Sequence, residues 1–324
     1  MQADLTFFQK TKAFVKRSPT IMAVVISFLL YGFTVFMVPT AFNIGAISTI
    51  FMLALLLSFA SAGQTMVLIG GGLDFTVGAV MSCAALITTT IMYSQDGRVL
   101  PALISVLALG AAVGLVNGIC TVKIGLPALV VTMAIGNVLT QLTFAFLGGN
   151  QGRFAGPAFI QSIVHRFFGF IPAVSLYALI VFPLVFYILY RSRFGRQLYL
   201  VGNNPEAARL TGINVNRVKI LSYVISGMFS GFTGMLGAGL MQTARNQMFD
   251  EYAYNSLIAV IVGGTSFAGG IGNYTGTIAG SLLMVVLNNM LTALQLSQPV
   301  RNIMLGAVLV LLLVMYNRRK SVRQ

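Results

Sequence analysis

The chain has 324 residues, of which 57% are apolar and only 8% are charged. Ordinary soluble domains carry about 25% charged residues, so this composition excludes a soluble globular enzyme and a disordered chain. The net charge of +14 is interpreted as a membrane-topology signal and not as a nucleic-acid surface, because the basic residues do not gather on one element.

The apolar stretches predict an all-α, polytopic transmembrane bundle of about ten spans, because about 20 apolar residues cross a bilayer. The expected spans are 20–39, 47–69, 74–93, 101–120, 126–147, 171–190, 219–240, 254–270, 272–293 and 299–316. If both termini are cytoplasmic, 15 of the 20 basic residues lie in segments on the cytoplasmic side. The five basic residues on the other side are Arg98, Arg153, Arg166, Arg245 and Arg301. This distribution follows the positive-inside rule. We therefore treat residues 1–324 as one transmembrane domain.

Two of these spans carry a glycine at every fourth residue. The two sets are Gly110, Gly114 and Gly118 in one span and Gly272, Gly276 and Gly280 in another. A spacing of four places each set on one helix face, where helix backbones can approach closely. Packing within the chain is favoured over a seam between two chains.

A glycine-rich break, Gly70 to Gly78, separates the second and third expected spans with almost no loop. It contains Gly72, Asp74 and Gly78, and Asp74 is the only acid within a predicted membrane stretch. A buried acid is a candidate for a functional site such as a proton relay. The favoured alternative is that Asp74 caps the following helix by accepting from N–H groups near Thr76 and Val77.

The longest basic segment expected inside the cell is residues 191–218, and it contains a short helix signal. Asn204 suits an N-cap, Pro205 the first helical position and Glu206 the positive helix end. Gly212 suits the left-handed position after the helix. Such a helix has little core of its own, so it either lies on the membrane or docks on a partner.

A second break, Val262 to Gly272, is uncharged and too short for a soluble loop. It contains Gly263, Gly264, Gly269 and Gly270 and is interpreted as a buried turn. The chain has no G-x-x-x-x-G-K-[ST] loop, so we expect no ATPase site and no enzymatic activity in it. No metal site is expected either, because His165 has no second His or Cys beside it.

Four motifs in order resemble those of one family. Glu206-Ala207-Ala208 followed by Gly212 resembles the EAA-x-x-x-G coupling motif of ABC importer permeases. The remaining motifs look like the ribose-type sugar permease branch, with mild departures at Phe75, Thr76 and Phe267. Residues 72–78 are similar to the branch's G-x-D-L-S-V-G motif, and residues 262–272 to its I-G-G-T-S-x-x-G-G-x-G motif. Residues 126–132 resemble the stretch that opens its fifth span. Shorter matches surround the coupling motif at 193–196, 202–203 and 212–215.

The resemblance implies the permease subunit of a bacterial ABC importer for a monosaccharide or similar small polyol. It also implies several partners: a second permease chain (identical or different), a cytoplasmic sugar-type ATPase that holds ATP and Mg²⁺, and a periplasmic sugar-binding protein. The implied contacts with the ATPase are Glu206, Ala207, Ala208, Arg209 and Gly212. The alternative reading is an ion-coupled secondary transporter, for which Asp74 is the main argument.

Neutral amides and hydroxyls within the spans are candidates for the translocation pathway, because a sugar needs hydrogen-bond partners that hold it weakly. They are Gln64, Thr65, Asn137, Thr140, Gln141, Asn288 and Asn289. Outside, residues 148–170 and 245–254 are expected to face the binding protein, with Arg153, Arg166 and Arg245 pairing with acidic groups on it or with lipid headgroups.

Overall fold

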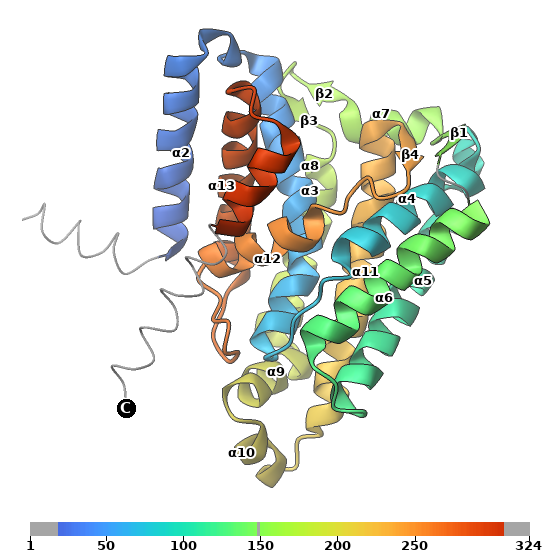
Figure 1. Cartoon of the computed structure of the whole chain (residues 1–324), viewed down its shortest axis with the longest axis vertical. Helices are drawn as coiled ribbons and strands as arrows, with labels where there is room; N and C mark the ends of the chain where they lie inside the picture. Colours follow the sequence, from blue (N-terminus) through green and yellow to red (C-terminus); the bar gives the residue numbers. More distant parts are fainter. Residues whose placement is uncertain (1–18, 148–149, 308–324) are drawn as a thin grey trace, which may run out of the picture.

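The computed structural model describes residues 19–147 and 150–307, which form a bundle of helices (Figure 1). Its larger helices are α2 (Pro19–Met37), α3 (Ile44–Ile69), α4 (Val77–Met92), α5 (Val99–Val122), α6 (Ala128–Leu147), α8 (Ser175–Phe186), α11 (Val215–Met241), α12 (Tyr252–Val262) and α13 (Tyr274–Ala293). Smaller elements are η1 (Pro39–Ala41), η2 (Asp96–Arg98), α7 (Pro157–Val164), the π-helical turn η3 (Tyr187–Arg191), α9 (Arg193–Asn203) and α10 (Pro205–Leu210). A further helix begins at residue 298 and reaches the end of the described residues. The predicted all-α, multi-span class is confirmed.

Six helices within the described residues are long and apolar enough to cross a membrane, namely α2, α3, η2 with α5, α6, α11 and α13. Residues 175–191 and α9 form a seventh candidate span if they are counted as one segment, although the chain bends by 61° between them. The last expected span, 299–316, lies partly outside the described residues. The expected cytoplasmic termini lie wholly outside them. The total of about ten spans therefore stays a prediction.

Two of the expected spans are shorter as helices than their apolar stretches suggested. Helix α4 begins only at Val77, and α12 ends at Val262. The expectation of one span over 254–270 is wrong in its second half, because Gly264, Gly269 and Gly270 adopt φ values of +96°, +84° and +74°. Such left-handed backbone cannot continue an α-helix.

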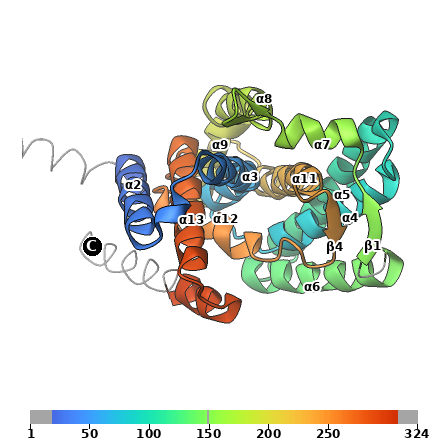
Figure 2. The same cartoon turned by 90° about the horizontal axis from the view of Figure 1, so that it is seen from above.

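Helix α11 runs through the middle of the bundle, between α3 and α5 (Figure 2). The glycine stripe of α5 lies against it: a Cβ on Gly110 would stand 2.0 Å from the Gly227 carbonyl oxygen. In the second set only Gly276 and Gly280 lie on α13, so the expectation of one helix face is wrong for Gly272, which precedes the helix. A Cβ on Gly276 would stand 1.9 Å from the Gly263 carbonyl oxygen. Both contacts lie within the chain, so the expected role of the stripes in intrachain packing is confirmed.

The two ends of the bundle differ in construction (Figure 1). At one end, which we call the α10 end, α9 and α10 lie beside both glycine breaks. At the opposite end, the strand end, two short antiparallel pairs form: β1 (Asn150–Phe154) with β4 (Thr243–Arg245), and β2 (Arg166–Phe167) with β3 (Ile171–Pro172). The β1–β4 pair places Arg245, the first residue of one segment expected to face the binding protein, opposite Asn150 of the other.

Candidate functional site: the junction of the glycine breaks with α9 and α10

The two glycine breaks meet at the α10 end of the bundle. The first break covers residues 70–76 and the second covers 263–273. The backbone N–H of Gly270 donates to the carbonyl of Ile69, at 2.8 Å. Gly269 packs so closely on Gly71 that a Cβ on it would lie 3.1 Å from the Gly71 backbone. The breaks therefore form one structure, although about 190 residues separate them in the sequence.

Helix α9 covers this meeting point. A Cβ on Gly202 would lie 1.8 Å from the Ile69 carbonyl oxygen and 2.6 Å from the Gly270 nitrogen. The Tyr199 hydroxyl donates to the Gly272 carbonyl at 2.8 Å. Close packing transmits displacement because interiors are not continuously deformable, so any movement of α9 reaches both breaks together.

Asp74 holds the first break to α11. Its carboxylate accepts hydrogen bonds from the Thr76 N–H at 2.9 Å, from the Thr76 hydroxyl, and from the Ser226 hydroxyl on α11 at 2.8 Å. Asn117 on α5 in turn donates to the Thr76 hydroxyl at 2.9 Å. Asp74 is only 1% exposed, and among the described residues no basic side chain pairs with it. The predicted bond to the N–H of Thr76 is confirmed, but the expectation that Asp74 caps α4 is wrong, because Thr76 holds the N-cap position and makes no side-chain cap bond. Asp74 instead fixes the turn that precedes the helix.

Helix α10 forms where the capping residues predicted it. The Asn204 side chain accepts from the N–H groups of Glu206 and Ala207, at 3.0 and 3.1 Å. Gly212 has φ +81°, and the Ile213 N–H donates to the Ala208 carbonyl at 3.1 Å. These bonds close the helix with a Schellman motif. A six-residue helix capped at both ends keeps its shape with little core of its own.

The residues of α10 that the resemblance assigns to ATPase coupling do not all face outward. Glu206, Ala207 and Arg209 are exposed, whereas Ala208 is 4% exposed and belongs to the main apolar core. The small size of Ala208 is thus required inside its own chain. Leu210, which the sequence analysis did not select, is 90% exposed.

The candidate pathway residues lie in three different settings. Gln64 and Thr65 are fully buried in α3. Thr65 bonds to the Thr277 hydroxyl at 2.8 Å, whereas neither polar atom of the Gln64 amide has a partner among residues 19–147 and 150–307. The α6 residues divide, since Thr140 is buried while Asn137 and Gln141 are exposed. Asn288 and Asn289 of α13 are half-buried. None of these side chains lines the pocket between α5, α10 and α11 or the pocket beside α7 and α8.

The arginines expected to face a binding protein lie at the strand end. Arg245 is exposed on β4, where it is the register partner of Asn150 on β1. Arg166 is exposed on β2, and its guanidinium donates to the Thr49 hydroxyl at 3.4 Å. Arg153 lies in β1, but its side chain falls outside the described residues.

Several residues of the junction were missed by the sequence analysis. Ser226, Asn117 and Tyr199 each contact a break from a distant helix. A single serine, asparagine or tyrosine in an apolar helix has no local pattern that marks its partner. Gly202 was noted only as part of a motif, although it makes the closest contact of the junction.

Comparison with known proteins places the chain among transport permeases. Residues 46–313 match the family model described as "Branched-chain amino acid transport system / permease component". The ribose import permease protein RbsC of Escherichia coli (strain K12) is 29% identical over 317 residues, which cover 96% of each chain. The galactose/methyl galactoside import permease protein MglC of Haemophilus influenzae is 30% identical over 302 residues, 87% of this chain and 89% of that protein. RbsC of Bacillus subtilis is 30% identical over 80% of each chain. No solved structure matches.

Proposed function

This chain belongs to the permease family of branched-chain amino acid transport systems, and we propose that it imports a monosaccharide or similar small polyol. It acts as the multi-pass permease subunit of a bacterial ABC importer in the inner membrane, driven by ATP hydrolysis in a partner subunit. The observation that carries this proposal is the similarity to ribose and galactose import permeases over most of the chain.

The polar side chains within the spans favour a sugar over an amino acid. An amino acid carries an ammonium and a carboxylate group, and moving charges through a low-dielectric bundle requires charged partners. The candidate pathway residues are neutral amides and hydroxyls, which suit the hydroxyl groups of a polyol. Asp74 is already bonded to Thr76 and Ser226, so it offers no free carboxylate. The same bonds argue against an ion-coupled secondary transporter that uses Asp74 as its relay.

Coupling follows from the way α10 is built into the junction. The exposed face of α10 docks on the ATPase at the cytoplasmic side, and ATPase closure displaces α10 and the adjoining α9. Because Gly202 touches the carbonyl before the first break and the N–H of the second, both breaks move in one step. This single movement switches the pathway from outward to inward facing.

Uptake by reconstituted vesicles tests the proposed function. The permease, its ATPase and its binding protein are placed in proteoliposomes, and accumulation of labelled ribose, galactose and leucine is measured with ATP and a protonophore. We expect ATP-dependent sugar uptake that persists with the protonophore. Transport by this chain alone on a proton gradient, or uptake of leucine in place of sugars, contradicts the proposal. The subunit masses of the purified complex decide whether the second permease chain is identical.

The docking role of α10 is tested by Ala207→Trp. Ala207 is exposed, so a bulky side chain there leaves the fold intact but fills the space in which the ATPase docks. We expect transport to be lost while the protein inserts normally. Lys123→Trp, at an exposed position of the same end outside α10, is the control and keeps transport. If α10 lies on the membrane surface, Ala207→Trp is tolerated as well, because tryptophan favours the interface.

The pathway assignment of α6 is tested at Asn137. Because Asn137 is an exposed amide on α6 and a pathway residue meets water in only some states, a cysteine there should react with a water-soluble thiol reagent in one nucleotide state and be shielded in another. The experiment uses a background without the native Cys83 and Cys120. A cysteine at 137 that never reacts places this face against lipid and removes Asn137 from the pathway.

A further inference from the structure

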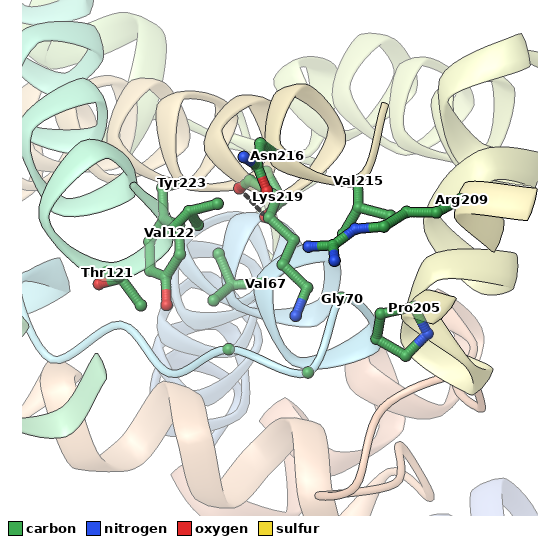
Figure 3. Close-up of a pocket in the computed structure, with 13 residues that line it drawn as sticks. Val67, Gly70, Thr121, Val122, Pro205, Arg209, Val215, Asn216, Lys219 and Tyr223 are labelled. Carbon is green, nitrogen blue, oxygen red and sulfur yellow. Dashed lines mark hydrogen bonds between the residues drawn. The ribbon is translucent and has the colours of Figure 1, made fainter. Parts of the chain in front are cut away.

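A small pocket opens between α10, the start of α11, the end of α5 and the first glycine break (Figure 3). Its volume is about 180 Å³. A water molecule occupies about 30 Å³ in the liquid, so this space holds several waters or one small polyatomic ion. The pocket lies at the α10 end, and none of the candidate pathway residues lines it.

The charged groups of the pocket are all positive. Arg209 from α10 and Lys219 from α11 point into it from different elements (Figure 3), and no carboxylate lines it. Their charges repel each other, and neither charged group has a hydrogen-bond or ion-pair partner among the described residues. Asp74, which lies behind Tyr223, is not part of the lining and is engaged by Thr76 and Ser226.

Neutral donors complete the lining. The Tyr223 hydroxyl accepts from the Leu73 N–H at 3.3 Å, which leaves its own hydrogen free to donate. The Asn216 side chain lies beside Lys219 in the lining (Figure 3). A guanidinium, an ammonium and neutral donors around a space of this size match a tetrahedral dianion better than a neutral ligand.

We propose that this pocket binds a phosphate group, carried either by an anionic lipid headgroup or by a soluble phosphomonoester. The bound group bridges Arg209 and Lys219 and so ties α10 to α11 beside the first break. Its occupancy sets how freely α10 moves. The inference concerns a site separate from the transported substrate, and it stands whichever sugar the protein carries.

Phosphate titration of the full chain in an uncharged detergent tests the site. Inorganic phosphate is the probe, and binding is followed by ³¹P line broadening and by the rise in melting temperature that binding to the folded state requires. We expect saturable binding that Lys219→Gln weakens by about tenfold or more, the loss of one charge-assisted hydrogen bond. Lys219→Arg keeps the charge and restores binding, which separates loss of the ligand from loss of the fold.

The matched control is Arg217→Gln, which removes a charge two residues away, on an exposed side chain that does not line the pocket. It should leave phosphate binding unchanged. Equal effects of Lys219→Gln and Arg217→Gln overturn the proposal, because they show only the general attraction of a basic surface. Absence of saturable binding to the wild-type chain overturns it as well.

Native mass spectrometry distinguishes the two sources of the phosphate group. The chain is released from nanodiscs of phosphatidylcholine with phosphatidylglycerol. If the occupant is a lipid headgroup, the wild-type protein retains one more phosphatidylglycerol than Lys219→Gln. If it is a soluble phosphomonoester, the two proteins retain equal lipid, and saturable phosphate binding persists in discs of either composition.

Discussion

The two glycine breaks begin alike and are then held by different means. Helix α3 ends with Gly70 and Gly71, and α12 ends with Gly263 and Gly264. In both cases a left-handed glycine closes a Schellman motif. Beyond that point the first break depends on Asp74, whose bonds reach α11. The second closes on itself through backbone bonds, for example from the Ser266 N–H to the Ile271 carbonyl at 2.8 Å.

This difference locates the weak points of each break. The first is fixed by side chains from other helices, so it fails when a polar partner is removed. The second depends mainly on left-handed glycines and tight backbone contacts, with one side-chain bond from Tyr199 to the Gly272 carbonyl, so it fails when a side chain is added. The helix starts show the same division. Asn273 caps α13 locally, whereas α4 begins at Thr76 without a side-chain cap, and Asp74 ties the turn before it to α11.

The largest effect is expected at Asp74. Asp74→Leu leaves the Thr76 N–H and two hydroxyl groups unpaired in the bundle, which should lower the free energy of unfolding by about 3 kcal/mol or more. Asp74→Asn keeps an acceptor for Thr76 and should cost about 1 kcal/mol with most transport retained. Thermal unfolding in detergent and vesicle uptake measure the two variants. An inactive Asp74→Asn beside a folded and equally inactive Asp74→Leu would instead indicate a proton relay.

An intermediate effect is expected from alanine at one left-handed glycine of each break. Gly270 and Gly71 have φ values of +74° and +77°, so either substitution incurs about 1–2 kcal/mol of backbone strain. A Cβ on Gly270 would also lie 2.8 Å from the Asn203 backbone, whereas on Gly71 its nearest neighbour is 4.0 Å away. Overpacking should therefore lower the free energy of unfolding by another ~1–3 kcal/mol in Gly270→Ala, but not in Gly71→Ala.

Thermal unfolding of the two alanine variants tests this order. Gly32→Ala, on a helix face with nothing within 4 Å, is the control and should be neutral or slightly stabilising. Equal losses at positions 71 and 270 would mean that the second break does not depend on its contact with α9.

The smallest effects are expected from single hydroxyl groups. Ser226→Ala removes one bond to the buried Asp74 carboxylate and should cost about 1–2 kcal/mol. Thr265→Val removes a buried hydroxyl of the second break that has no partner in the described part of the chain, so stability should stay within about 0.5 kcal/mol or rise. Chemical unfolding of both variants decides the comparison. A greater loss for Thr265→Val would show that side chains hold the second break after all.

Local patterns predicted the elements whose forces are local. The caps Asn204 and Gly212 define α10 within nine residues, and the glycine stripes define faces that pack within the chain. Apolar length predicted the long helices well, but it placed the end of α12 too late, because the residues after Val262 are apolar without being helical. Hydropathy measures burial and does not distinguish a helix from a buried turn.

Composition and capping alone thus determined that this is a helical membrane protein with a short capped helix and two glycine breaks. Only the tertiary structure decided that the breaks touch, that Gly202 of α9 lies on both, and that Ser226 bonds to Asp74. It also decided that Ala208 faces inward and that Arg209 and Lys219 share a pocket. Periodicity and capping act between residues a few positions apart. Those contacts instead join residues from about 10 to about 200 positions apart, whose meeting depends on how whole helices pack.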